Sequence, residues 1–203
     1  MTLLPLTLSF SLDELAAIAA TDALDRVGDC CSFCGGAIGV RYCDTVGEPS
    51  CVLCGLARHL ERPRIDDEAR LIWLPEMSQA GLNVLIREMH CRLRALGERL
   101  DLDSRPTVAT DDRICVYHAQ QALLARGEAA AARLDSALPS HLADALVRLS
   151  PSAYRRRARL LSGIRLLPAG RFFDGEDDIY PEIVDSWRAT GAGVADAAAA
   201  GAA

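Results

Sequence analysis

Two Cys-x-x-Cys-Gly units constrain this chain more than any other feature. The first pair is Cys31 and Cys34, the second is Cys51 and Cys54, and 16 residues lie between the two pairs. Zinc prefers four thiolates in a tetrahedron, with sulfur at about 2.3 Å from the metal. Two Cys-x-x-Cys pairs at this separation are typical of structural zinc sites. We therefore predict that Cys31, Cys34, Cys51 and Cys54 bind one Zn²⁺ ion.

These thiols have two alternatives to a zinc site. A redox centre is an alternative, but it needs only one Cys-x-x-Cys pair. Reduced core cysteines are another, although two glycine-flanked pairs then have no purpose. Cys30 competes with Cys31, but its three-residue gap to Cys34 fits a knuckle less well. The pattern leaves open whether Cys30 or Cys43 replaces a ligand, whereas Cys91 and Cys115 are expected in the core.

Composition limits the class of protein. The chain has 203 residues, a net charge of −6 and 22 basic side chains, all of them arginine. A nucleic-acid-binding protein usually carries a basic field, so direct nucleic-acid binding is not expected. No apolar run is long enough for a spanning helix, and the first residues do not resemble a signal peptide. These features predict a cytoplasmic protein, in which eight cysteines indicate metal or free thiols rather than disulfides.

The elements around the cysteines follow from local pattern. Residues 2–10 favour an edge strand or an extended arm, and 12–27 have the spacing of a helix capped by Ser11. Residues 40–43 favour a strand that turns back at 47–49. The run 55–61 favours a helix. A knuckle, a hairpin and a helix that carries the second cysteine pair would form a zinc treble clef. The N-terminal end of that helix would help to keep the thiolates ionised.

The rest of the chain is mainly helical. Residues 71–74 favour a buried strand, and a long amphipathic helix begins at Glu76 or Ser78. Most of the second half favours helices, with a short apolar strand or turn at 164–167. We predict an α+β protein with a zinc treble-clef module at 1–100, flanking helices included. An α-helical lobe at 101–188 and a disordered alanine- and glycine-rich tail at 189–203 complete the predicted organisation.

Three charged clusters lie outside the cysteine segment. Asp66–Glu68 and Asp177–Asp178 are interpreted as solvated linker. Arg155, Arg156, Arg157 and Arg159 form either a solvated helix face or a surface for acidic lipid headgroups, phosphate or an acidic partner. The overall acidity of the chain argues against DNA as that partner.

Two further segments carry a resemblance to a known family. The first is Leu-Pro-Glu-Met-Ser-Gln-Ala at 74–80, continued by Leu82 and Asn83, and the second is Ile-Arg-Leu-Leu-Pro at 164–168, followed later by Trp187. Together with the two preceding knuckles, this order resembles the IcmJ/DotN family. That family is a zinc-binding component of the coupling complex in Dot/Icm-type (type IVB) secretion systems. Compared with the family pattern, the gap between the knuckles is shorter here, and an acidic insert lies at Asp174–Asp178.

The resemblance implies a non-catalytic adaptor or structural subunit. Its partners would be the C-terminal extension of the coupling ATPase and other subunits of the coupling complex, and it would support substrate export. It would lie in the cytoplasm, at the periphery of the inner membrane through those partners. Carried over by motif, the zinc ligands would be Cys31, Cys34, Cys51 and Cys54. Whether the complex exports protein or conjugates DNA, how many copies assemble and which surface meets the partner are left open.

Enzymatic and nucleic-acid-binding functions are the alternatives. The family pattern is related to HNH endonucleases, whose treble clef carries catalytic histidines and a divalent metal. Such a nuclease needs one histidine between the knuckles to activate water and a second to bind the metal. Residues 35–50 contain no histidine, and His59 alone cannot fill both roles. We therefore expect a degenerate HNH-like module that is not an enzyme, with a zinc module that binds nucleic acid as a further alternative.

Overall fold

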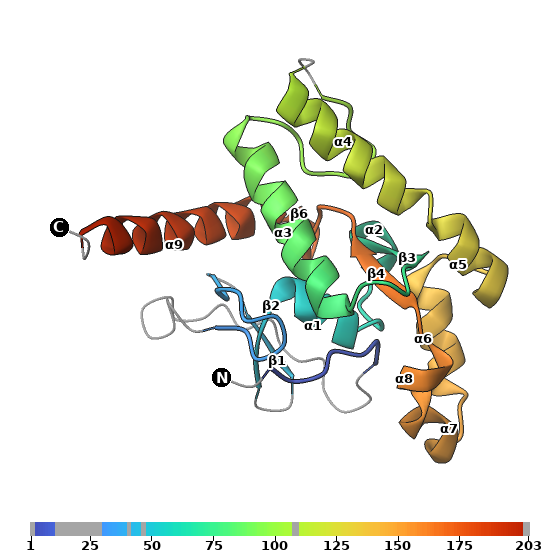
Figure 1. Cartoon of the computed structure of the whole chain (residues 1–203). Coiled ribbons are helices and arrows are strands. Elements are labelled where there is room, and N and C mark those ends of the chain that lie inside the picture. The colour runs from blue at the N-terminus through green and yellow to red at the C-terminus, as the bar shows by residue number, and fades with distance from the viewer. Residues whose placement is uncertain (1–2, 11–29, 40–41, 46–47, 107–109, 201–203) are drawn as a thin grey trace.

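A computed structural model describes residues 3–10, 30–39, 42–45, 48–106 and 110–200, with side chains left out at 42–48 and 191–200. Within these ranges the fold combines helices with two-stranded antiparallel sheets (Figure 1). The predicted helix at 12–27 lies outside the described residues. The elements, in chain order, are β1 (Tyr42–Thr45), β2 (Glu48–Cys51), α1 (Val52–Arg58), α2 (Ile65–Glu68), β3 (Ala69–Trp73), α3 (Gln79–Ala95), α4 (Asp111–Leu124), α5 (Gly127–Leu134), α6 (Pro139–Val147), α7 (Pro151–Arg155), α8 (Arg157–Leu160), β4 (Ile164–Pro168), β5 (Phe173–Asp174), β6 (Asp177–Asp178) and α9 (Tyr180–Ala200).

The strands β3 and β4 form the centre of the molecule. They pair antiparallel, with Leu71 opposite Leu166 and Trp73 opposite Ile164. Leu71, Ile72 and Leu166 are fully buried because α3 covers β4 and α5 covers β3. The two predicted strands are therefore confirmed. Their pairing joins the range 1–100 to the range 101–188, and the predicted division at residue 100 stays a prediction.

A sharp turn leads into β4 at Gly163. Its φ of +84° lies in the left-handed region that glycine adopts without strain. A Cβ at this position would also collide with the ring of Trp73. Glycine is therefore required here both by the backbone conformation and by the close approach of the indole.

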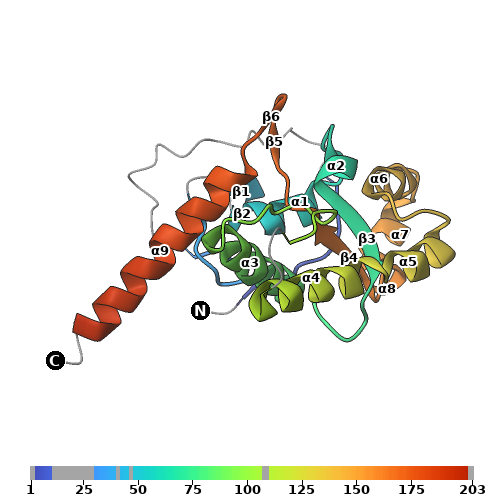
Figure 2. The ribbon, with the colours of Figure 1, turned by 90° about the horizontal axis from the view of Figure 1, so that it is seen from above.

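The long helix α3 connects the centre to the cysteine segment. Its N-cap is Ser78, one of the two starts expected from the sequence, and Ser78 Oγ accepts a hydrogen bond from the backbone N–H of Gly81 at 3.0 Å. Leu82 and Ile86 are fully buried on the inner face. Besides β4, α3 packs on α1 and α9, and Figure 2 shows these helices beside one another.

The first residues, 3–10, form an extended arm rather than a strand. Backbone N–H groups of Leu4 and Ser9 donate to the carbonyls of Ser32 and Ala57, at 2.8 and 3.0 Å. The N–H of Leu60 in turn donates to the carbonyl of Ser9 at 3.2 Å. The arm therefore ties the first knuckle to α1, in agreement with the extended arm expected from Pro5.

Three local expectations were wrong. The segment 64–70 is not a solvated linker, because it contains α2, and Glu68 is completely buried. Glu68 accepts hydrogen bonds from Arg62 Nε at 2.7 Å and from the backbone N–H of Phe173 at 2.8 Å, which compensates the buried charge. The helix expected at 55–61 begins earlier, at Val52. Glu48 and Pro49 belong to β2 rather than to the turn.

The C-terminal region also differs from the expected tail. A disordered segment was expected from residue 189, but α9 runs from Tyr180 to Ala200 (Figure 1). Alanine has the highest helix propensity of all residues, and a run of alanines favours helix even where glycine interrupts it. The first half of α9 is anchored by Tyr180, Ile183 and Trp187, which are buried.

Candidate metal centre

The four predicted zinc ligands come from three local structures. Cys31 and Cys34 lie in a turn in which the N–H of Gly35 donates to the carbonyl of Cys31 at 2.9 Å. Gly35 has a φ of +72°, so the glycine after the first pair permits the turn. Cys51 ends β2, and Cys54 lies in the first turn of α1.

The geometry of the four sulfurs fits a tetrahedral metal ion. Their Sγ atoms all lie within 4.8 Å of one another, and Cys34 Sγ is 3.7 Å from Cys51 Sγ. A tetrahedron with zinc–sulfur bonds of about 2.3 Å has sulfur–sulfur edges of about 3.8 Å. Cys31, Cys51 and Cys54 are buried and Cys34 is half-buried. The donor set therefore fits a metal ion held entirely by protein sulfur, with no coordination position left for substrate.

The thiols behave as one coupled set. Hydrogen bonds from Cys34, and then from Cys51 and Cys54, lower the pKa of Cys31. Hydrogen bonding to Cys31 and Cys34 raises the pKa of Cys54. Four such groups cannot all be thiolates in a buried site without a compensating cation, which a divalent metal would supply.

A buried polar chain connects Cys54 to the centre of the fold. Asn83 Nδ2 donates to Cys54 Sγ at 3.3 Å, and Gln79 Nε2 donates to Asn83 Oδ1 at 2.9 Å. Gln79 also exchanges two hydrogen bonds of 2.8 Å with the backbone of Leu166 in β4. Gln79 and Asn83 are 4% and 1% exposed. This series of hydrogen bonds therefore fixes the orientation of Cys54 from outside the four cysteines.

Arg87 adds a positive charge beside the first knuckle. Its guanidinium packs directly against Gly36, the residue after the Gly35 turn, and lies over the ring of Trp187 at 4.7 Å. A Cβ at Gly36 would collide with this guanidinium and lie 3.6 Å from Cys34 Sγ. A cation at this place favours thiolate over thiol.

Sequence reasoning missed both Asn83 and Arg87 as neighbours of the cysteines. The position of Asn83 did indicate a buried hydrogen-bond partner, because Asn83 and Gln79 are polar residues on the face of α3 that also holds Leu82 and Ile86. A polar residue on a buried stripe needs a partner. The position of Arg87 gave no such indication, because an arginine on an amphipathic helix is expected to face solvent.

The remaining cysteines lie elsewhere. Cys30 is exposed and does not belong to the cluster, which agrees with the preference for Cys31. The side chain of Cys43 lies outside the described residues. Cys91 is half-buried and packs against the core, but Cys115 is exposed on α4, so its assignment to the core was wrong. The apolar neighbours of Cys115 in sequence do not face the same way.

The histidine considered for nuclease chemistry has a different environment. His59 follows α1, and its Nδ1 lies 3.2 Å from Glu61 Oε1. Among the described residues, the group able to hold a metal consists of the four cysteines alone. His90 is buried and shares a hydrogen bond of 2.7 Å between its Nδ1 and the hydroxyl of Tyr180.

Comparison with known proteins gave no assignment: no protein-family model matches the chain, and no curated protein matches it. In the described part of the chain, no helix is both long and apolar enough to cross a membrane.

Proposed function

We propose that this protein is a zinc-stabilised adaptor without catalytic activity, a subunit of a type IVB secretion coupling complex. In this proposal Cys31, Cys34, Cys51 and Cys54 hold one Zn²⁺ ion. The turn, the β1–β2 hairpin and α1 form a treble clef around it. The partner is the C-terminal extension of the coupling ATPase, as in the family that the motifs at 74–83 and 164–168 resemble.

The closed cysteine cluster is the observation that carries this proposal. A structural zinc site uses four protein ligands, whereas a catalytic site keeps one position for water or substrate. Four sulfurs within 4.8 Å of one another match the structural kind. Asn83 and Arg87 then act on the ligands, and neither is placed to activate a water molecule.

Exposed aliphatic residues on the N-terminal arm and on α3 support a docking role. Leu3 is 48% exposed and packs near Gly35, while Val84 is 46% exposed, one helical turn before Arg87 on α3. Leu4 and Leu85 are 39% and 37% exposed. Exposed aliphatic groups are typical of surfaces that receive an apolar peptide face.

Two measurements on the full chain test the proposal. Metal analysis should give one equivalent of zinc, and a pull-down should retain the C-terminal tail of a type IVB coupling ATPase encoded in the same genome. Val84→Asp with Leu85→Asp should abolish tail binding while zinc content stays unchanged. Glu88→Ala, an exposed change on the same helix, is the matched control.

Other outcomes would redirect the assignment. Zinc without tail binding would refute the adaptor role while keeping the metal centre. Cleavage of plasmid DNA with Mg²⁺ or Mn²⁺, lost in His59→Ala, would favour the nuclease alternative. Absence of zinc from protein purified without chelators would refute the metal centre itself.

A further inference from the structure

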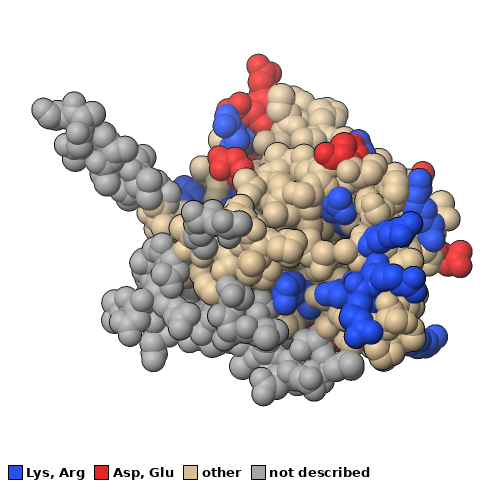
Figure 3. All heavy atoms as spheres, turned by 60° about the horizontal axis from the view of Figure 1, so that its bottom comes forward, with Lys and Arg blue, Asp and Glu red and all other residues tan. Residues whose placement is uncertain are grey.

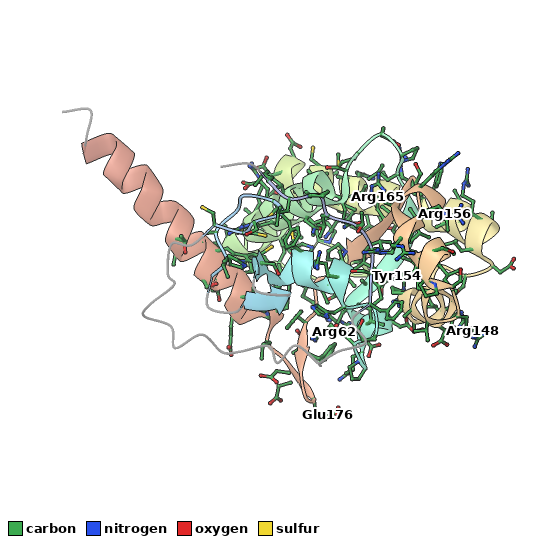
Figure 4. The ribbon with its side chains drawn as sticks, turned by 90° about the horizontal axis from the view of Figure 1, so that it is seen from below. Arg62, Arg148, Tyr154, Arg156, Arg165 and Glu176 are labelled. Atoms are coloured by element: carbon green, nitrogen blue, oxygen red, sulfur yellow. The ribbon has the colours of Figure 1, made fainter. Side chains whose placement is uncertain are left out.

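Four exposed arginines gather at the end of the molecule formed by α6, α7 and α8. Arg148 follows α6, Arg155 ends α7, Arg156 lies between α7 and α8, and Arg159 lies in α8. We refer to these four residues as the arginine surface. Figure 3 shows basic side chains crowded over this end, and Figure 4 places Arg148 and Arg156 on neighbouring helices there.

Among the described residues, no carboxylate forms an ion pair with the arginine surface. The sequence from 145 to 173 contains seven arginines and no aspartate or glutamate. In the described part of the chain, none of the four arginines has a carboxylate within 4.0 Å. Elsewhere, arginines pair with acidic side chains; these are Arg62, Arg64, Arg92, Arg94, Arg99, Arg113, Arg126 and Arg188. The positive charge of this surface is therefore available to an external anion.

Two exposed aliphatic side chains are adjacent in sequence to arginines of this surface. Val147 immediately precedes Arg148 and is 53% exposed, and Leu160 immediately follows Arg159 and is 60% exposed. They are the two most exposed large apolar residues in the described part of the chain. A site for small anions has no need of such side chains, whereas an interfacial site requires cationic and apolar groups side by side.

Tyr154 and Arg157, which lie between the four arginines in sequence, have structural roles instead. Arg157 Nε donates to the carbonyl of Leu8 at 3.2 Å, and its guanidinium covers the Tyr154 ring at 4.3 Å. The Tyr154 hydroxyl donates to the carbonyl of Phe10 at 3.2 Å, and the two rings pack edge to face. Both residues therefore hold the N-terminal arm. The Tyr154 ring is occupied, so it offers no free face for stacking a nucleic-acid base.

We propose that the arginine surface, with Leu160 and Val147, binds the surface of an anionic phospholipid membrane. Guanidinium groups pair with lipid phosphates, and the two aliphatic side chains enter the boundary between headgroups and acyl chains. The net charge of −6 does not prevent this, because at physiological salt a charge acts over about 8 Å. Asp144, one helical turn before Arg148 on α6, is the nearest acidic residue in sequence, and Arg155, Arg156 and Arg159 have none between 145 and 173.

Vesicle flotation with the full zinc-loaded chain tests the proposal. The protein should float with vesicles of phosphatidylcholine and phosphatidylglycerol but not with phosphatidylcholine alone, and added salt should weaken binding. The triple variant Arg155→Glu, Arg156→Glu, Arg159→Glu should weaken binding at least about tenfold, because each basic residue near an anionic surface contributes substantially. Leu160→Ser should weaken binding at a fixed salt concentration by removing the inserted side chain.

A variant of equal charge change provides the control. Arg99→Glu, Arg105→Glu and Arg188→Glu alter exposed arginines on other parts of the molecule and should leave vesicle binding nearly unchanged. Zinc content and far-UV circular dichroism should be the same for both triple variants. Loss of vesicle binding in the first triple variant alone would then locate the membrane contact at α7 and α8.

Three outcomes would overturn the proposal. The wild-type chain could ignore anionic vesicles, or the two triple variants could bind them equally. Full competition by inorganic phosphate, together with normal binding of Leu160→Ser, would indicate a site for soluble anions instead. Capture of an acidic peptide by the arginine surface, without any affinity for vesicles, would assign it to a protein partner.

Discussion

The knuckle segment, 30–39, and the strand pair β3–β4 are both well buried, yet they are ordered by different means. Between 30 and 39 the chain makes a turn and an isolated bridge, and its buried residues include Cys31 and Phe33. β3 and β4 form a ladder of five residue pairs covered by helices on both sides. Burial alone therefore does not explain how each of these two regions is held in place. The knuckle segment contributes Cys31 and Cys34 to a cysteine cluster that could hold a metal ion, whereas β3 and β4 combine apolar packing with backbone pairing.

Removal of the metal should separate the two regions most clearly. Zinc binding contributes about 10–16 kcal/mol in small zinc peptides, so chelation should unfold the knuckle segment and leave β3–β4 intact. Hydrogen exchange followed by mass spectrometry should show lost protection at 30–39 and retained protection at 164–168. Cys54→Ser should reproduce this pattern, whereas Cys115→Ser, an exposed position, should not. Equal protection with and without chelator would remove the distinction between the regions.

Disruption of the buried ion pair between Arg62 and Glu68 should destabilise the packed region and leave metal binding intact. Glu68→Ala removes the carboxylate that pairs with Arg62, and loss of one member of a buried pair typically costs about 3–5 kcal/mol. Urea denaturation should show this loss in the free energy of unfolding while zinc stoichiometry remains one. Asp67→Ala, which removes an exposed pair with Arg64, should cost less than about 1 kcal/mol. A comparable loss in both variants would contradict the role given to burial.

Acid should destabilise the packed region through His90. Burial lowers the pKa of His90 from 6.5 to about 4. Because the unfolded chain binds the proton more readily between these values, stability falls as pH decreases from 6.5 to 4, by about 3 kcal/mol. The difference in unfolding free energy between the wild type and His90→Gln should change by this amount over that range. A difference that is constant with pH would show that His90 does not contribute.

Loss of the hydrogen bond between Asn83 and Cys54, which links the two regions, should have the smallest effect. Asn83→Ala removes the hydrogen bond to Cys54 Sγ, and loss of an outer hydrogen bond to a ligand typically weakens metal binding about 10–100-fold. Competition with a zinc chelator measures this affinity. Val84→Ala, the adjacent exposed change, should leave it unchanged. Equal affinities for Asn83→Ala and the wild type would mean that the two regions are not coupled through this chain of hydrogen bonds.

Local pattern predicted the parts of the fold that are encoded locally. The cysteine spacing identified the four residues that the structure brings together. Ser78 was one of two expected starts of α3, and the short apolar runs indicated β3 and, as a strand or turn, β4. Each of these depends on neighbours within a few residues. The same reasoning placed Cys115 in the core because it considered the helix pattern without the helix packing.

Contacts between distant segments could not be predicted in this way. Nothing in 69–73 specifies that its partner is 164–168, and the hydrogen bonds that allow Glu68 to be buried come from Arg62 and Phe173. An acidic triplet is therefore interpreted as solvated until its partners are known. The same holds for Asn83, whose polar side chain on a buried stripe indicates a partner without identifying the cysteine.

The antiparallel pairing of residues 69–73 with 164–168 determines the order in which the protein can fold on the ribosome. The four clustered cysteines have all been synthesised once Cys54 has emerged, whereas the central ladder must wait for more than a hundred further residues. At typical translation rates this delay is roughly ten seconds. During that time the nascent chain exposes an unpaired apolar strand while the cysteine cluster can already form, so metal supply and chaperone capture would act on the chain at different moments.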